Sequence, residues 1–97
     1  MKQTLTILAQ VRAKPGMEAA MIAAQERLVA VTVSSPGCLR YELHRSNSDA
    51  GAVAFIEEWA SREAWLAHMN SDYMEAFRAT GGNAIGEFAL QEMHRIA

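Results

Sequence analysis

The sequence contains a single cysteine, Cys38, and lacks any long run of apolar residues. One cysteine cannot form an internal disulfide, and it supplies too few thiolates for a metal cluster. No stretch approaches the roughly 18 consecutive apolar residues that a membrane-spanning helix needs. The first residues also lack the layout of a signal peptide. We therefore expect a cytoplasmic protein with no membrane partner.

The chain also lacks a strong excess of positive or negative charge. Nine Lys and Arg residues stand against 11 Asp and Glu residues, which gives a formal net charge of −2, and the two signs are interleaved. A nucleic-acid-binding domain normally shows a basic stripe or patch, so we expect no nucleic-acid partner. The glycines do not have the spacing of a phosphate-binding loop. The three histidines are far apart and no second cysteine accompanies them, so we expect no metal site.

What the chain does contain is ordinary globular composition. Hydrophobic residues make up 51% of it and charged residues 21%, values far from those of disordered chains. A length of 97 residues suffices for one domain and is too short for two. We expect a single domain over residues 1–97.

Hydrophobic periodicity predicts the order of the elements. Alternation with a period of two predicts strands at residues 4–13, 38–45, 52–60 and 84–96, the middle two joined as a hairpin. In the second strand, Leu39, Tyr41 and Leu43 are predicted to share one face. An apolar stripe at helical spacing predicts a helix from Met17 to about Val33, with Gln25 off the stripe. The stripe consists of Met17, Met21, Ala24, Leu28 and Val31. Ser61 and Ser71 are predicted N-caps of two shorter helices, the second of which ends at Gly81-Gly82.

This order indicates an α+β fold of the ferredoxin-like β-α-β-β-α-β type, with a four-stranded antiparallel sheet. Helices in such a fold cover one face of the sheet. The strand patterns predict a second apolar face, which carries Leu8, Ile56, Phe88 and Leu90. A large exposed apolar face normally finds a partner, and the simplest partner is a second copy of the chain. We therefore predict a homodimer.

A pair of glutamates closes the third predicted strand. Because neighbouring residues alternate sides, Glu57 should share a face with Trp59, and Glu58 with Ile56. A carboxylate on an apolar sheet face is costly unless it is paired. We expect an ion pair at the end of this strand, for instance with Arg40 or Arg45.

His68 is the candidate for acid–base chemistry. It lies three residues after Trp65 and five before Tyr73, and an imidazole can exchange a proton near pH 7. The alternative is a structural histidine that bonds helix ends or bridges the turn at Asn70-Ser71. Trp65, Tyr73 and Phe77 likewise fit either a core or the wall of a pocket for a flat aromatic ligand. Both interpretations stay open on these grounds.

Several segments together resemble the antibiotic biosynthesis monooxygenase family, a dimeric α+β barrel group that includes quinol monooxygenases. They are residues 36–45, Glu57-Glu58-Trp59, Ala67-His68 and residues 71–77. The resemblance covers nearly the whole chain and implies a pocket between helices and sheet in each subunit. It also implies an oxygenase that needs no metal or flavin. Its small substrate, an electron-rich phenol, quinol or anthrone, would itself supply the electrons to O₂.

The resemblance also implies roles for individual residues. His68 would be a proton acceptor or phenolate partner, and Tyr73 a hydrogen-bond donor. The residues implied in substrate binding are Trp59, Trp65, Phe77 and Asn83. The haem-degrading branch of this fold resembles the chain at Asn70-Ser71-Asp72. However, His68 stands where that branch has a tryptophan and Arg78 where it has its axial histidine, which argues against haem.

Two other functions are compatible with the same fold. One is a non-catalytic protein that binds an aromatic metabolite. The other is an isomerase of a small phosphorylated signalling molecule. An isomerase of this kind would need a cation inside its pocket, such as Arg40, Arg62 or Arg78 pointing inward.

Overall fold

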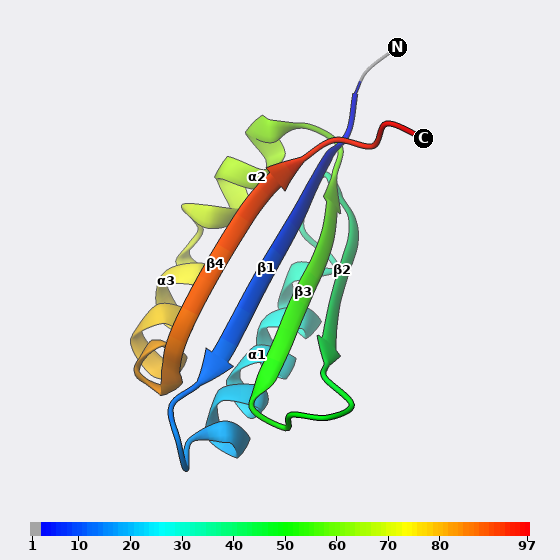
Figure 1. The fold of residues 1–97 in the computed structure, drawn as a ribbon. Helices are drawn as coiled ribbons and strands as arrows, with labels where there is room; N and C mark the ends of the chain where they lie inside the picture. The colour runs from blue at the N-terminus through cyan, green and yellow to red at the C-terminus, as the bar shows by residue number, and fades with distance from the viewer. Residues whose placement is uncertain (1–2) are drawn as a thin grey trace.

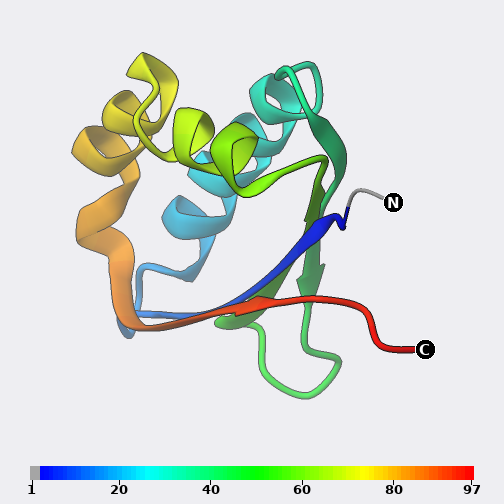
Figure 2. The same ribbon diagram turned by 90° about the horizontal axis from the view of Figure 1, so that it is seen from above.

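A computed structural model describes residues 3–97, in which a four-stranded antiparallel sheet carries all its helices on one face (Figures 1 and 2). The elements in chain order are β1 (Leu5–Ala13), α1 (Glu18–Thr32), β2 (Cys38–Arg45), β3 (Ala52–Trp59), α2 (Arg62–Met69), α3 (Asp72–Gly81), a 3₁₀ turn (Gly82–Ala84) and β4 (Ile85–Met93). The sheet order is β2-β3-β1-β4. This is the predicted ferredoxin-like α+β arrangement, with the second helical segment divided into α2 and α3. Within residues 3–97, no helix is both long and apolar enough to cross a membrane.

The core lies between the sheet and the helices. Alternate residues of the central strand β1 are buried there, and β3 contributes the residues that face them across the ladder. These buried residues are Ile7, Ala9, Val11 and Ala13 on β1, and Val53, Phe55, Glu57 and Trp59 on β3. The predicted faces of both strands are confirmed, including the placement of Glu57 beside Trp59.

The buried face of α1 is rotated from the predicted stripe. Met21, Ala24 and Leu28 are buried as expected, but Val31 is 50% exposed and Gln25 is fully buried. The predictions for Val31 and Gln25 were therefore wrong. Residues 21, 25, 28 and 32 follow one another at steps of four, three and four and are all buried, so the helix turns this line toward the sheet.

A β-bulge in β2 changes which residues face the core. Cys38 pairs with Trp59 and Arg40 pairs with Glu58, so the register shifts between Cys38 and Arg40. The extra residue, Leu39, is 56% exposed instead of lying on the buried face with Tyr41. The predicted side for Leu39 was wrong because a bulge breaks the alternation on which that prediction depended.

A second irregularity reverses the prediction for β4. Ile85 pairs with Ala13 and Phe88 pairs with Val11, so Gly86 is the extra residue in this ladder. A Cβ at Gly86 would lie 3.3 Å from the Lys14 nitrogen, so a side chain here would make a tight contact with the backbone. The register therefore aligns Phe88 and Leu90 with buried β1 residues on the helix-covered face. Their predicted position on the open face was wrong.

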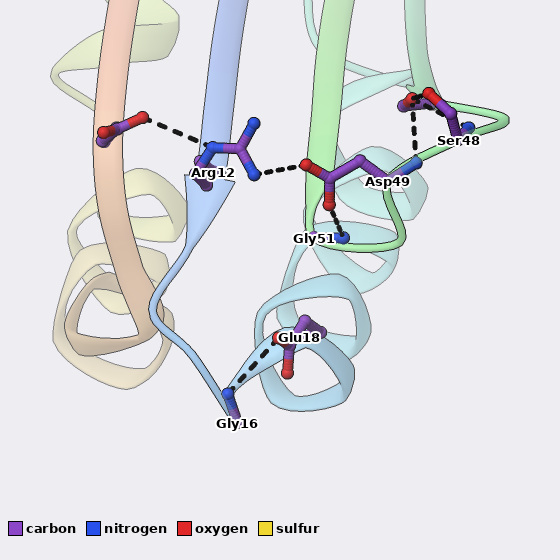
Figure 3. Close-up of polar contacts among 8 residues, drawn as sticks. Arg12, Gly16, Glu18, Ser48, Asp49 and Gly51 are labelled. Carbon is purple, nitrogen blue, oxygen red and sulfur yellow. Dashed lines mark hydrogen bonds and ion pairs between the residues drawn. The ribbon is translucent and has the colours of Figure 1, made fainter.

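The open face of the sheet is more polar than predicted. Leu8 and Ile56 lie opposite each other on it and are half-buried. Four residues further along β1, Arg12 forms ion pairs with Asp49 in the β2–β3 loop and with Glu87 on β4, the latter at 3.4 Å (Figure 3). Asp49 also accepts a hydrogen bond of 3.0 Å from the Gly51 amide (Figure 3). This network fixes the β2–β3 loop against the lower end of the open face.

Candidate functional site

Six side chains gather between the sheet and the helices and form what we call the histidine cluster. They come from the segment after α1 and from β2, β3, α2 and α3, so the fold as a whole assembles them. The members are Ser35, Tyr41, Glu57, Trp59, His68 and Tyr73.

His68 lies at the centre of this cluster. Its side chain is buried, with 4% of the residue exposed, and its ring centroid is 4.7 Å from that of Trp59 at an angle of 35°. Tyr41 meets the imidazole edge-on at 5.5 Å. Burial, helped by the positive charge of Arg78, lowers the pKa of His68 to about 4. The imidazole is therefore neutral at pH 7, and one of its two ring nitrogens carries no hydrogen.

Tyr73 connects His68 to the segment that follows α1. Its hydroxyl lies 2.5 Å from His68 Nδ1 and 2.7 Å from Ser35 Oγ. A neutral imidazole can accept the first of these bonds at Nδ1, and Tyr73 can then accept the second from Ser35. The imidazole is thus held by a tyrosine hydroxyl and does not bridge the Asn70-Ser71 turn.

The two N-caps explain why His68 and Tyr73 meet. Ser61 Oγ accepts a hydrogen bond from the Ala64 amide at 3.1 Å, which starts α2. Ser71 Oγ accepts from the Met74 amide at 3.2 Å, which starts α3, and donates to the His68 carbonyl at 2.6 Å. Both predicted caps are confirmed. The second one joins the end of α2 to the start of α3 at the residue that carries the imidazole.

Glu57 is the buried carboxyl group of the cluster, with 5% of the residue exposed. Its Oε1 accepts a hydrogen bond of 2.9 Å from Trp59 Nε1. The expected ion pair at the strand end was wrong, because Arg40 pairs with Glu42 and none of the ion pairs within residues 3–97 includes Glu57 or Arg45. Burial raises the pKa of Glu57 to about 7, and the bond from Trp59 opposes this only in part.

The structure thus brings three of the predicted site residues together: Trp59, His68 and Tyr73. Trp65 is buried in the core, with the Arg62 guanidinium 5.7 Å from its ring centroid. Asn83 is exposed in the 3₁₀ turn, and no hydrogen bond within residues 3–97 joins it to the cluster.

Three cluster members, Ser35, Tyr41 and Glu57, were not among the predicted site residues, although the sequence held a signal for two of them. Alternation along β3 had already placed Glu57 beside Trp59. Tyr41 lies directly opposite Glu57 in the ladder between β2 and β3. The predicted hairpin already placed Tyr41 on an alternating strand, so its face could have been deduced. Ser35 lies outside helices and strands, where no periodicity indicates the direction of a side chain.

A groove between α1 and α3 leads toward the cluster. It has a volume of about 190 Å³ and is lined by Ala24, Arg27, Leu28, Val31, Tyr73, Ala76, Phe77 and Thr80. Tyr73 borders this groove, and its hydroxyl contacts His68. A larger hollow of about 590 Å³ lies over the open face of the sheet near Arg12, His44 and Ala54. We place the candidate site at the histidine cluster, where buried titratable groups and aromatic rings meet.

Comparison with known proteins agrees with the fold and with this arrangement of elements. The sequence model described as "Antibiotic biosynthesis monooxygenase" matches residues 4–80, well over half of the chain. The chain belongs to this family. Both the family and the ferredoxin-like fold predicted from the sequence are thereby confirmed, and a monooxygenase is the class of enzyme that membership suggests.

Two solved structures illustrate how closely other proteins share the fold. PA3566 from Pseudomonas aeruginosa is 28% identical to this chain and has a TM-score of 0.94. The superposition covers 100% of this chain and 98% of PA3566. A protein described as an antibiotic biosynthesis monooxygenase is 26% identical to this chain and has a TM-score of 0.89. The superposition covers 96% of this chain and 99% of that protein's chain.

One curated relative was also found, the uncharacterized protein sll1783 from Synechocystis. It is 22% identical over 93 residues, which are 96% of this chain and 63% of that protein. The chain therefore spans less than two thirds of the length of the curated relative that it matches.

Proposed function

We propose that this protein is a monooxygenase that oxidises a small electron-rich aromatic compound of the quinol, phenol or anthrone type with O₂ and without a cofactor. One observation carries the proposal. This protein belongs to the antibiotic biosynthesis monooxygenase family, and its neutral, buried His68 is bonded to the Tyr73 hydroxyl and packed on the Trp59 indole ring. Such a group can accept a proton from a substrate in a site that excludes water.

The chemistry asked of the protein is limited, because the substrate supplies all the electrons. In an anthrone, a CH₂ carbon becomes a C=O carbon, one oxygen atom of O₂ stays on that carbon and the other leaves as water. The carbon gives up four electrons and O₂ takes four, so no further reductant is needed. The protein has to bind the ring, remove a proton so that the electron-rich anion forms, and admit O₂.

The cluster suggests how its members would divide this work. Tyr73 would pass its hydroxyl proton to His68 Nδ1 and take the substrate's proton in exchange, so that His68 is the final proton acceptor. The new Tyr73 O–H would then donate a hydrogen bond to the substrate anion. Trp59 would provide a flat wall, and Phe77 borders the groove through which a ring would enter. Substrate contacts by Trp65 and Asn83 stay predictions.

We also propose that the protein acts as a homodimer in which the open faces of two sheets meet. The half-buried pair Leu8 and Ile56 on this face supports the proposal. A contact of this kind would cover apolar side chains that the helices of one subunit leave exposed.

Oxygen uptake tests the proposed reaction. Metal-free protein is mixed with a panel of menadiol-type quinols, and the rate is corrected for spontaneous oxidation in buffer. We expect consumption above the buffer rate, and a loss of at least about 100-fold in His68→Asn, the usual scale for removing an acid–base group. His94→Asn serves as the control because His94 is exposed beyond the end of β4. No consumption above buffer, or an unchanged rate in His68→Asn, would refute the proposal.

The same experiment separates the alternative functions. Tight binding of a panel compound without turnover would indicate a protein that sequesters an aromatic metabolite. The isomerase alternative depended on an inward-pointing arginine. Arg40 and Arg62 are exposed and paired with Glu42 and Glu92, and Arg78 is exposed with a bond to the Met69 carbonyl. This arrangement gives a phosphorylated substrate no support.

A further inference from the structure

Gln25 is a buried polar side chain that the protein itself does not satisfy. The residue lies in the middle of α1 and is fully buried. Neither its Oε1 nor its Nε2 has a hydrogen-bond partner within residues 3–97. An amide enclosed without partners costs free energy that a leucine or methionine of similar size would not cost. A position that keeps such a group is a candidate for contact with a ligand.

The amide faces the layer between α1 and the sheet. Gln25 is on the same helical line as Met21 and Leu28, and both of these belong to the core. Thr32, further along this line, is also fully buried, but its hydroxyl donates to the Leu28 carbonyl at 2.7 Å. Thr32 is thus satisfied within the helix, whereas Gln25 is not.

The groove between α1 and α3 lies next to this layer, although Gln25 itself does not line it. Ala24 and Leu28, which flank Gln25 on the helix, line the groove together with Tyr73 and Phe77. Tyr73 in turn contacts His68 through its hydroxyl. The groove volume of about 190 Å³ is below the roughly 300 Å³ of the smallest usual ligand pockets. A ligand here has to be small and flat.

We propose that Gln25 is a ligand-contacting residue whose amide hydrogen-bonds the hydroxyl or carbonyl group of a small aromatic molecule that enters between α1 and α3. An amide suits this role because its nitrogen donates and its oxygen accepts. It can bind a phenolic hydroxyl and the carbonyl formed from it by oxidation equally well. The choice of an aromatic ligand rests on the proposed function, but binding at Gln25 requires no turnover.

Calorimetric titration tests the inference with two matched probes. Menadione carries two carbonyl groups, and 2-methylnaphthalene has the same ring system without them. We expect the wild type to bind menadione at least about tenfold more tightly than 2-methylnaphthalene, on the scale of one net hydrogen bond. In Gln25→Leu this preference should disappear through weaker menadione binding, while binding of 2-methylnaphthalene is kept.

Stability measurements show whether a loss of binding in a variant is caused by a poorly folded protein. Gln25→Leu and Gln25→Met should unfold at the same or a higher urea concentration than the wild type, since each removes an unsatisfied amide. Thr32→Val is the control on the same buried line and should keep the preference for menadione. The inference is overturned if the wild type has no such preference, or if Gln25→Leu and Gln25→Met both retain it. The latter result would mean that the amide is satisfied by an internal water molecule.

The two proposals fail in different ways. If menadione binds through Gln25 but quinols are not consumed, the inference holds and the monooxygenase proposal is refuted. If quinols are consumed equally fast by the wild type and Gln25→Leu, and both bind menadione equally tightly, the monooxygenase proposal holds and the inference about Gln25 is refuted.

Discussion

His68 and Glu57 are two titratable residues in contact with the same indole ring, and burial shifts their pKa values in opposite directions. The pKa of His68 falls to about 4 and that of Glu57 rises to about 7, because an enclosed site disfavours the charged form of either group. Both groups are therefore mainly uncharged between these two values. In that range the cluster can take up or release a proton without burying a pair of opposite charges.

These shifts predict opposite pH dependences of stability in two variants. In Glu57→Gln, only the histidine shift remains of the two in this pair. The unfolded histidine gains a proton below its ordinary pKa of about 6.5, whereas the folded one does so only near 4. The free energy of unfolding should therefore rise by up to about 3 kcal/mol as the pH increases from 4 to 6.5. Urea titrations at a series of pH values measure it.

In His68→Asn, only the glutamate shift remains of the two in this pair. The unfolded carboxyl group loses its proton near pH 4.5, and the folded one near 7. The free energy of unfolding should fall by a similar amount, up to about 3 kcal/mol, as the pH increases between these values. Glu58→Gln, on the opposite face of β3, should follow the wild type, in which the two slopes largely cancel. Slopes of the same sign in both variants would contradict the assigned burial of these groups.

At the scale of single residues, the sequence predicted some positions and missed others for identifiable reasons. Alternation along β3 correctly placed Glu57 beside Trp59. Gln25 was placed off the buried stripe because a polar residue is normally assigned to the outer face of a helix. Nothing in the sequence marks an amide that the fold encloses.

At the scale of elements, the turn before β2 depends on a glycine for two reasons. Gly37 has a φ of +78°, which L side chains rarely adopt, and a Cβ there would lie 2.5 Å from the Ala64 Cβ on α2. Its carbonyl also accepts a hydrogen bond of 2.8 Å from the Ala60 amide. The turn therefore sets how closely α2 approaches the start of β2.

Replacing this glycine should separate the cost of the backbone from the cost of the clash. Gly16 has a similar φ of +83° but no atom within 4 Å of its ideal Cβ, so Gly16→Ala should lose about 1 kcal/mol of stability. Gly37→Ala should lose about 2 to 4 kcal/mol, because α2 must also move. Urea denaturation of both variants measures the difference. Equal losses would show that α2 can move away from the added Cβ at no cost in stability.

The sequence predicted which elements exist better than it predicted their faces. The second strand was predicted at residues 38–45 and is observed at Cys38–Arg45, and both serine caps are where the sequence placed them. The wrong faces of Leu39, Phe88 and Leu90 all follow from bulges. A bulge adds one residue to a strand, and a strand that is apolar on both faces gives no sign of where the alternation is reversed.

At the scale of the whole molecule, the proposed homodimer gives the open face of the sheet a role in assembly. Ile56 lies near the middle of this face, opposite Leu8 on β1 and Glu42 on β2. In a face-to-face dimer a lysine at this position would have to leave water, and an ion pair with the neighbouring Glu42 would not make up for the lost hydration and the lost apolar contact. Ile56→Lys should therefore weaken dimerisation at least about tenfold.

Sedimentation equilibrium at micromolar concentration measures this effect. Val33→Lys is the control, since Val33 is 53% exposed at the end of α1 and lies on the helical side of the molecule. A wild-type protein that stays monomeric, or an Ile56→Lys variant that associates as the wild type does, would refute the proposed dimer.

We further propose that residues 1–97 unfold as one unit. Trp59 and Trp65 report on the core from β3 and α2, and circular dichroism reports on all helices and strands. The two signals should follow the same urea transition, as expected for a small two-state domain. The overall topology could be predicted from the sequence because it depends only on the order of the elements, and short turns mark where one element ends and the next begins.

The bulge at Leu39 has a consequence for unwanted association. Strand β2 lies at one margin of the sheet, where unpaired backbone amides and carbonyls could recruit a strand from another molecule. The irregular backbone between Cys38 and Arg40 and the ionic side chains of Arg40, Glu42 and His44 make this margin a poor template for such growth. Sheets of neighbouring molecules are thereby discouraged from joining side by side into a continuous ribbon, and the route toward fibrils is obstructed along this strand.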